Sequence, residues 1–271
     1  MTRGGLRTLN WGGVVLTLVT LAVGILWGFP LISTVAASLG LPPGSGRTPL
    51  EAIDLYRRAL FESDIGRWYV NSLVTAGGVT FLVLAISAPC AYAISQMHFR
   101  GRAALWYLIL ASFIIPVQAL IISHFFLMYN LGLINTWLGV ILPQLIAPVA
   151  VIIYKQFFDQ LPREFREAAA MDGATHGQIL FRVYLPINWG VTAALAIITF
   201  IGAWNAFLWP FLAVTRSPMM NVSVAMGQST SGLGEAYLAG SVLAGLPMAI
   251  VYLIFQRRVT QAVVMSAGIK G

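Results

Sequence analysis

The sequence predicts an all-α fold: one polytopic membrane domain over residues 1–271, with six transmembrane helices and a helical loop outside the membrane between helices four and five. Three observations support this prediction. Of the 271 residues, 58% are hydrophobic and 9% are charged, whereas charged residues approach a quarter of a soluble domain. Several stretches without charge are long enough to cross a bilayer. The longest charged interruption, residues 159–186, has the pattern of two short helices.

The first transmembrane helix is expected at about residues 13–37, because no charged residue occurs between Arg7 and Arg47. Arg3 and Arg7 before an apolar run also resemble a secretory signal peptide. However, this run is longer than the roughly 7–15 apolar residues of such a peptide. We therefore expect a retained anchor. A polar segment with an amphipathic helix over residues 49–62 follows outside the membrane.

The next three helices are expected at about residues 68–95, 103–128 and 136–158. A basic turn over residues 98–102 and a polar turn over residues 130–136 separate them. Pro116, Pro143 and Pro148 fall inside these segments, where neighbouring helices can satisfy the carbonyl groups that a proline frees. We expect kinks at these positions within otherwise continuous helices.

The loop over residues 159–186 has start and stop signals for two helices. Pro162 suits a first helical position, since its missing N–H would be unpaired there anyway. Gly173 stands where a left-handed cap is expected after a helix over residues 163–172. Thr175 with Gln178 offers a capping box for a second helix, which Pro186 is expected to close.

The fifth and sixth helices are expected at about residues 187–212 and 236–256, joined by an outside loop over residues 213–235. With the N-terminus in the cytoplasm, six crossings place the whole net charge of +7 on the cytoplasmic side, as the positive-inside rule requires. Both termini and the 159–186 loop are therefore expected in the cytoplasm. The basic balance then gives no reason to expect nucleic-acid binding.

The residues offer little for catalysis or metal binding. Cys90 is the single cysteine and can form no internal disulfide, and the three histidines are scattered. Paired carboxylates, a serine elbow and a glycine-rich phosphate loop are missing from the sequence. We therefore expect no catalytic residue, metal or cofactor on this chain, and any ATP would be bound by another chain.

The 159–186 loop has one spaced motif, Glu167-Ala168-Ala169, three residues, Gly173, nine residues, then Val183-x-Leu185-Pro186. This motif resembles the cytoplasmic loop by which permease subunits of ATP-binding-cassette (ABC) importers dock on their ATPase. The slim alanine face and the apolar Phe165 and Met171 suit an interface with a polar rim. An ordinary surface hairpin is the alternative. The residues expected to dock are Phe165, Glu167, Ala168, Ala169, Met171, Asp172, Gly173, Leu185 and Pro186.

The likeness extends over roughly residues 65–271 and is closest to the shorter permease of maltose-type systems in the carbohydrate subgroup. It includes Asn71-Ser72-Leu73, Phe99-Arg100-Gly101-Arg102, Gly132-Leu133-Ile134-Asn135-Thr136, Phe158-Asp159-Gln160-Leu161-Pro162, Phe200-Ile201-Gly202-Ala203-Trp204-Asn205, Phe207-Leu208-Trp209-Pro210 and Gly268-Ile269-Lys270-Gly271. Two positions differ from the family pattern. Ala206 replaces a common acidic residue, and Gln261-Ala262 stands where glycine is common.

The resemblance implies a bacterial inner-membrane importer with several partners. These are a second, different permease, two copies of an ATPase that binds ATP and Mg, an extracytoplasmic solute-binding protein, a sugar substrate and membrane lipid. This chain would transmit force from the ATPase and make or break no bond itself. It would alternate between inward-facing and outward-facing forms.

Two further sets of residues are candidates for contact with substrate and binding protein. Intramembrane polar and aromatic groups are the default pathway candidates: Asn71, Gln118, His124, Trp204, Asn205 and Trp209. Interhelical hydrogen bonding or interfacial anchoring is the common alternative for such residues. Within the loop over residues 217–234, Met219, Met220 and Asn221 are candidates for contact with the binding protein, or parts of a solvated connector.

Three other functions remain open at this point. A secondary carrier is one alternative, although the apolar segments hold no acidic or basic residue to couple ions. An intramembrane enzyme is a second. The third keeps the importer and changes its cargo to an amino acid, a polyamine or a glycerol phosphodiester.

Overall fold

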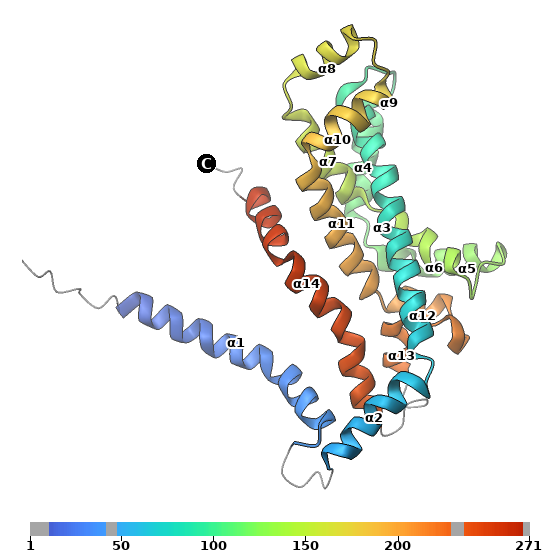
Figure 1. Ribbon diagram of the computed structural model, residues 1–271. Helices are drawn as coiled ribbons and strands as arrows, with labels where there is room; N and C mark the ends of the chain where they lie inside the picture. The colour runs from blue at the N-terminus through green and yellow to red at the C-terminus, as the bar shows by residue number, and fades with distance from the viewer. Residues whose placement is uncertain (1–10, 42–47, 229–235, 268–271) are drawn as a thin grey trace, which may run out of the picture.

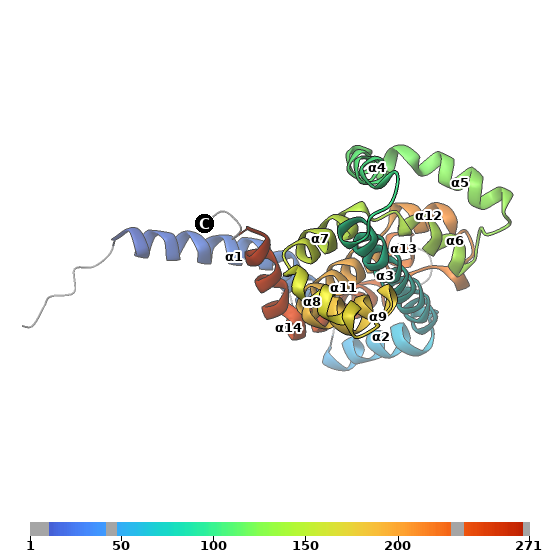
Figure 2. The same cartoon turned by 90° about the horizontal axis from the view of Figure 1, so that it is seen from above.

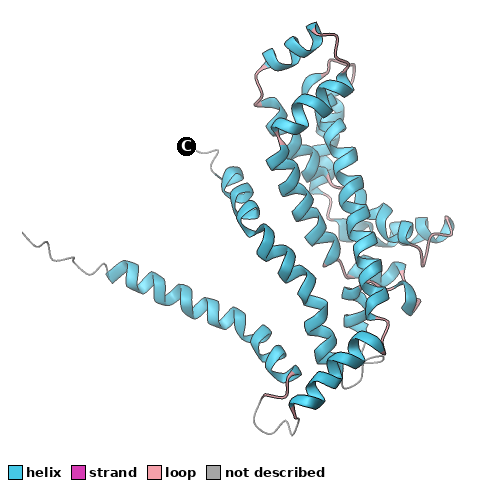
Figure 3. Ribbon diagram, in the orientation of Figure 1, coloured by secondary structure: helices cyan, strands magenta, loops and turns pink. Residues whose placement is uncertain are grey.

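The computed structural model describes residues 11–41, 48–228 and 236–267, and within these ranges the chain is helical, with no strand (Figure 3). This confirms the predicted all-α fold. The elements are α1 (Trp11–Ser38), α2 (Pro49–Phe61), α3 (Ile65–Gln96), α4 (Arg102–Ile114), η1 (Val117–Leu120), α5 (Ile121–Asn130), α6 (Trp137–Ile141), η2 (Leu142–Leu145), α7 (Pro148–Asp159), α8 (Arg163–Met171), α9 (His176–Ile179), η3 (Leu180–Tyr184), α10 (Leu185–Ile187), α11 (Trp189–Trp204), α12 (Leu208–Ala213), η4 (Ser217–Met219), α13 (Val222–Gln228) and α14 (Tyr237–Ala267).

Helix α3 is the central element of the bundle (Figure 1). Its 32 residues correspond to a length of about 48 Å at 1.5 Å per residue, and it packs along both α7 and α11. Its Ala76, Ala88 and Ala91 are almost completely buried, which lets neighbouring helices approach closely. The main core forms where α3 meets these two helices.

Three unbroken helices are long and apolar enough to cross a membrane: Gly12–Ser38, Ile65–Gln96 and Tyr237–Gln256. Three further pairs of helices pass the same test only together, and they bend by 91°, 50° and 83° at short breaks. The described residues therefore contain three to six spans. The number six stays a prediction, since it requires that each bent pair makes one crossing.

The expectation of continuous helices was wrong at Pro116 and Pro148, whereas the helical segment Trp137–Leu145 runs through Pro143 without a break. Helix α4 ends at Ile114, and Ile115 before Pro116 is extended, with φ −76° and ψ 118°. Ala147 before Pro148 is also outside the helical region, with φ −126° and ψ 67°. Proline disfavours the helical conformation of the residue that precedes it. The third and fourth predicted helices are consequently each divided in two.

The last two predicted helices also have different limits. Instead of one helix over residues 187–212, α11 ends at Trp204 and the separate α12 begins at Leu208. The last helix, α14, continues to Ala267, beyond its predicted end at residue 256.

Helix α2 and the loop that contains α8 and α9 lie at opposite ends of the bundle (Figure 1). The predicted amphipathic helix is present as α2, and its start is held by a capping box between Thr48 and Glu51. Farther along α2, the hydrogen bond from Arg57 holds the pKa of the Asp54 carboxyl below its ordinary value. Arg58 pairs with the same carboxyl.

Helix α1 extends away from the bundle and reaches it mainly near its C-terminal end (Figure 2). There Ser38 Oγ lies 2.7 Å from Tyr56 Oη of α2. Along the rest of the helix the apolar side chains are exposed, including Trp27 at 80%. Such a surface is stable only against lipid or another protein.

A clamp of hydrogen bonds joins the turn before α6 to the segment after α12. Asn135 has a positive φ of 62°, a conformation that asparagine tolerates better than most residues. Its Oδ1 accepts hydrogen bonds from the backbone N–H groups of Thr215 at 2.8 Å and Arg216 at 3.0 Å. Its own N–H donates to Ala213 O at 2.9 Å.

We predict that Gly139→Ala lowers the melting temperature of the detergent-solubilised protein. A Cβ at this position would collide with the backbone carbonyl of Leu133, which cannot move without distorting the turn. Forced overpacking of this kind costs about 1–3 kcal/mol. Gly77→Ala is the matched control, because nothing lies within 4 Å of its Cβ position. Equal melting temperatures for Gly139→Ala and the wild type would contradict the close packing of this turn.

Candidate functional site

The loop over residues 159–186 contains the two helices that its motif predicts. Helix α8 begins after Pro162, which is the N-cap and not the first helical residue. Gly173 has a φ of +76°, and its N–H donates to Ala170 O at 3.0 Å. The predicted left-handed glycine cap is confirmed, and its conformation is strained for any residue with a Cβ.

The second helix of the loop starts as predicted and ends slightly later than predicted. Thr175 Oγ1 accepts from Gln178 N at 3.3 Å, and Gln178 Oε1 accepts from Thr175 N at 2.8 Å. The chain then stays helical through Pro186 and ends at Ile187, so Pro186 does not close the helix. A wider π-helical turn over Leu180–Tyr184 precedes this proline, and the missing N–H therefore falls where the hydrogen-bond ladder is already irregular.

The residues of the motif divide into an exposed set and a packed set. Met171 is 89% exposed and Phe165 is 49% exposed, so both side chains are accessible to another protein. Ala169 and Leu185 instead pack against the core. The other predicted docking residues, Glu167, Ala168, Asp172, Gly173 and Pro186, are exposed.

Two sets of contacts hold this loop on the bundle. Arg166 Nη1 donates to Gln96 O at 2.7 Å, at the end of α3. Below it, the Tyr184 ring lies 5.2 Å from the Tyr92 ring of α3 and 5.4 Å from the Phe158 ring of α7, both edge to face. We did not predict this aromatic cluster from sequence, although Tyr184 occupies the variable position of the motif between Val183 and Leu185.

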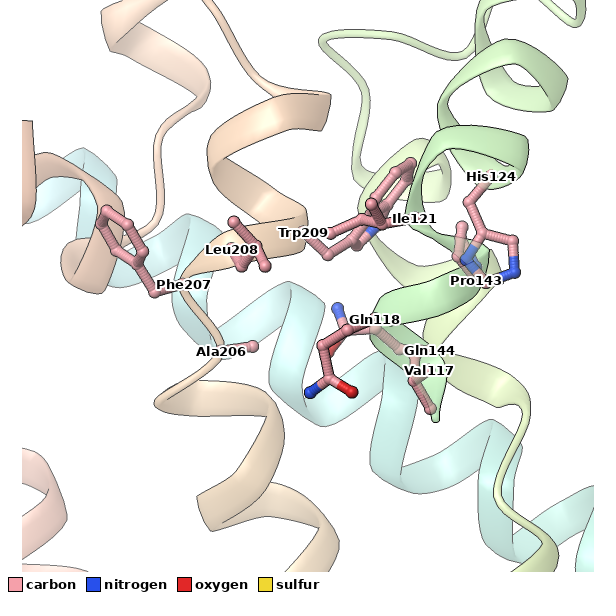
Figure 4. Close-up of a pocket in the computed structure, with 10 residues that line it drawn as sticks. All are labelled: Val117, Gln118, Ile121, His124, Pro143, Gln144, Ala206, Phe207, Leu208 and Trp209. Atoms are coloured by element: carbon pink, nitrogen blue, oxygen red, sulfur yellow. The ribbon is translucent and has the colours of Figure 1, made fainter. Parts of the chain in front are cut away.

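A pocket of about 260 Å³ lies in the bundle between the broken helices (Figure 4). Its lining comes from η1, α5, η2, α12 and the break before α12, namely Val117, Gln118, Ile121, His124, Pro143, Gln144, Ala206, Phe207, Leu208 and Trp209. Three of the six pathway candidates, Gln118, His124 and Trp209, therefore meet at one site. The His124 and Trp209 rings are 5.9 Å apart, edge to face. Gln144 was missed, although a glutamine in a charge-free segment was an available signal.

The other three pathway candidates lie outside this pocket. Trp204 is 2% exposed, with its ring 6.3 Å from that of Tyr69 and 5.9 Å from that of Phe200. Asn205 is exposed at the C-cap of α11, next in sequence to the pocket residue Ala206. Asn71 has structural partners, which are described next.

Asn71 joins α3 to two distant segments. Its Nδ2 donates to Pro218 O at 2.9 Å and Met220 O at 3.0 Å. Its Oδ1 accepts a hydrogen bond from Trp137 Nε1 at 3.0 Å. The Asn71 side chain is buried, and both of its polar atoms are hydrogen-bonded within the protein.

The three candidates for contact with a binding protein lie beside α3. Met219 and Met220 are partly buried, whereas Asn221 is 1% exposed and donates from Nδ2 to Thr75 Oγ1 at 3.0 Å. The part of the candidate loop at residues 229–234 lies outside the described residues. In the described part of the chain, no group of three or more histidine, cysteine, aspartate and glutamate side chains could hold a metal ion.

The long and broken helices, the helical loop at one end and the pocket between the broken helices define a membrane subunit of a transporter. Residues 88–264 match the family model described as "Binding-protein-dependent transport system inner membrane component". The chain belongs to this family. It is a multi-pass inner-membrane subunit of an ABC transport system, and it is not catalytic.

Relatives with different named cargoes resemble the chain to a similar degree. It is 34% identical over 207 residues to the arabinooligosaccharides transport system permease protein AraQ of Halalkalibacterium halodurans, covering 75% of this chain and 74% of AraQ. It is 33% identical over 215 residues to the diacetylchitobiose uptake system permease protein NgcG of Streptomyces coelicolor, covering 77% and 71%. It is 34% identical over 198 residues to the sn-glycerol-3-phosphate transport system permease protein UgpE of Yersinia pestis, covering 71% and 70%.

A solved structure has the same fold. It is a crystal structure of a bacterial ABC transporter that imports the polysaccharide alginate, and one of its chains superposes with a TM-score of 0.81 at 23% identity. The superposition covers 94% of this chain and 99% of the other.

We predict that Asn71→Ala lowers the melting temperature, whereas Gln118→Ala leaves it nearly unchanged. The first change leaves the Trp137 Nε1–H and two backbone carbonyls without their partner, and each buried polar group left unpaired costs about 1–3 kcal/mol. Gln118 is exposed and serves as the matched control. An Asn71→Ala protein as stable as the wild type would show that these hydrogen bonds do not hold the segments together.

Proposed function

We propose that this chain is one of two different permease subunits of a sugar importer, coupled to a separate ATPase through residues 163–186. The observation that carries the proposal is α8: a short helix with exposed Phe165 and Met171, closed by the Gly173 cap and joined to the end of α3 by the hydrogen bond from Arg166 to Gln96 O. An exposed aromatic and methionine pair with charged neighbours fits a protein interface. Two copies of the ATPase would bind ATP and Mg beneath the permease pair.

The contacts of the loop give a route for force into the bundle. A displacement of α8 pulls on the end of α3 through the hydrogen bond from Arg166 to Gln96 O. A displacement of the second loop helix presses on α3 and α7 through the ring of Tyr184. Packed interiors transmit strain rather than absorb it. Closure of the ATPase pair therefore moves α3 and α7 together. In this proposal the cycle turns the permease from inward-facing to outward-facing.

The distribution of charge supports the proposed orientation in the membrane. The exposed apolar surface supports contacts with the remaining partners. The loop and both termini are assigned to the cytoplasm, where the positive-inside rule places the net charge. The exposed apolar side chains of α1, such as Leu26 and Trp27, suit contact with the second permease and with lipid. At the opposite end, the partly buried Met219 and Met220 are assigned to the contact with the solute-binding protein, while Asn221 holds their segment on α3.

The pocket supports a sugar as cargo. Its amides, imidazole and indole (Gln118, Gln144, His124 and Trp209) match the hydroxyl groups and apolar faces of a sugar ring. None of the described residues that line it is Lys, Arg, Asp or Glu, which favours a neutral solute over a glycerol phosphodiester, a polyamine or an amino acid. We narrow the pathway candidates to Gln118, His124 and Trp209, with Asn205 beside them, and assign Asn71 and Trp204 to structural roles.

We predict that Gly173→Asp prevents stable assembly with the ATPase or uncouples ATP hydrolysis from transport. An aspartate at φ +76° strains the cap and reorients α8, since left-handed backbone costs of order 1 kcal/mol for a residue with a Cβ. Co-purification and transport-stimulated ATPase activity measure the effect. Gly66→Asp is the matched control at the opposite end, with open space at its Cβ position. Normal assembly and stimulation in Gly173→Asp would refute docking through α8.

We predict sugar uptake by vesicles that requires both internal ATP and the binding protein. In the same assay, Gln118→Ala should lower the apparent affinity about threefold to tenfold, the loss expected for one hydrogen bond. Labelled arabino- and chito-oligosaccharides are the first substrates to test, with glycerol 3-phosphate as the contrasting solute. Uptake by this chain alone, driven by an ion gradient, would contradict the proposal.

A further inference from the structure

A basic recess lies beside the loop, separate from the pocket between the broken helices. It is a cavity of about 320 Å³ where the ends of α3 and α7 meet α8. Four of its lining residues are the basic Arg102, Lys155, Arg163 and Arg166, and Asp159 is the one carboxylate in the lining. The recess therefore has an excess of positive charge.

The charges of the recess are positioned but only partly compensated. Lys155 pairs with Asp159. Arg102 Nη2 donates to Ser95 O at 3.1 Å and Arg166 Nη1 to Gln96 O, so the carbonyls at the end of α3 orient these guanidinium groups. Arg166 also forms an ion pair with Glu167 at 3.9 Å. Arg163 is exposed and has no hydrogen-bond or ion-pair partner among the described residues. An anion can therefore approach several oriented donors at once.

An apolar groove continues from this recess along the start of α4. A second cavity of about 490 Å³ shares Arg102 and Lys155 with the first and is otherwise lined mainly by Phe99, Ala103 and Trp106. Lys155 Nζ lies 4.7 Å from the centre of the Trp106 ring. The next residues of α4, such as Tyr107, are widely exposed. The basic recess is therefore continuous with a groove that contains aromatic side chains. This groove lies beside α4, whose next residues are exposed.

We propose that the recess and groove together bind an anionic phospholipid. Arg102, Lys155 and Arg163 contact its phosphate, and one acyl chain lies along Phe99 and Trp106. Basic pockets between membrane helices on the cytoplasmic side suit anionic head groups, and tryptophan suits the boundary between head groups and chains. A free phosphate or a protein carboxylate would use the recess and leave the groove unused. The bound lipid would brace the ends of α3 and α7 at the point where the loop is attached.

Lipid retention by the assembled importer tests the proposal. The complex is purified from nanodiscs that contain equal phosphatidylglycerol and phosphatidylcholine, and native mass spectrometry counts the lipids that stay bound. The wild type should retain phosphatidylglycerol preferentially, and Arg163→Gln should retain it about fivefold less, as expected for the loss of one charge near a membrane surface. Arg163→Lys should restore retention. Arg100→Gln removes a charge from the neighbouring turn outside the cavity and should change nothing.

A fluorescence measurement locates the lipid independently. Phosphatidylglycerol with brominated chains should quench the tryptophan fluorescence of the wild type more than that of Trp106→Leu, whereas brominated phosphatidylcholine should not distinguish them. Equal retention in wild type and Arg163→Gln, or no quenching at Trp106, would overturn the site. Displacement of the lipid by millimolar inorganic phosphate would show instead a site for a free anion. These readouts measure lipid and not transport. Because Arg163 belongs to the loop assigned to docking, the amount of ATPase that co-purifies with Arg163→Gln is measured as well, and lipid loss with unchanged ATPase content separates the lipid site from docking.

Discussion

Backbone polar groups inside a bilayer must find partners within the protein, because no water is there to replace them. Under this constraint α3 is unbroken, whereas the segments bonded to its N-terminal half through Asn71 and Thr75 are interrupted and find side-chain partners. At the break after α11, the Trp204 carbonyl accepts a hydrogen bond from Ser223 Oγ at 2.7 Å. At the end of α6, Trp209 Nε1 donates to the carbonyls of both Gly139 and Val140 at 3.2 Å. Side chains thus supply hydrogen-bond donors for the carbonyl groups at these helix breaks. The pocket lies between the same breaks.

The two ends of the bundle are built for different tasks. At the loop end, aromatic rings and arginine hydrogen bonds attach two short helices to α3 and α7, so that motion of the loop and of these helices is shared. At the other end, Asn71, Asn135 and Asn221 attach the segments around α12 and η4 by directional hydrogen bonds. Two smaller apolar clusters lie at the same end, one around Trp68 and Val222 and one around Trp209 and Val214. In the proposed function, the loop end receives the motion of the ATPase and the opposite end faces the binding protein.

Much of the fold and part of the site could be predicted from the sequence. Charge-free length predicted α1, α3 and α14, and local capping chemistry predicted the Gly173 cap and the Thr175 box, because these signals act within a few residues. The breaks at Pro116 and Pro148 were missed, since whether a proline kinks or divides a helix depends on what the neighbours can satisfy. Trp204 and Gln118 are both plausible pathway residues in sequence. In the structure, the packing of α11 on α3 buries Trp204. Gln118 on η1 is exposed instead.

Cysteine accessibility at position 118 tests the central claim that force on α8 opens this pocket. In the assembled importer, with Cys90→Ser as background, Gln118→Cys would be reacted with a membrane-impermeant thiol reagent from the outer side. The account predicts faster labelling when ATP closes the ATPase pair, and no such increase when Gly173→Asp is added. A labelling rate that is the same with and without ATP would contradict it.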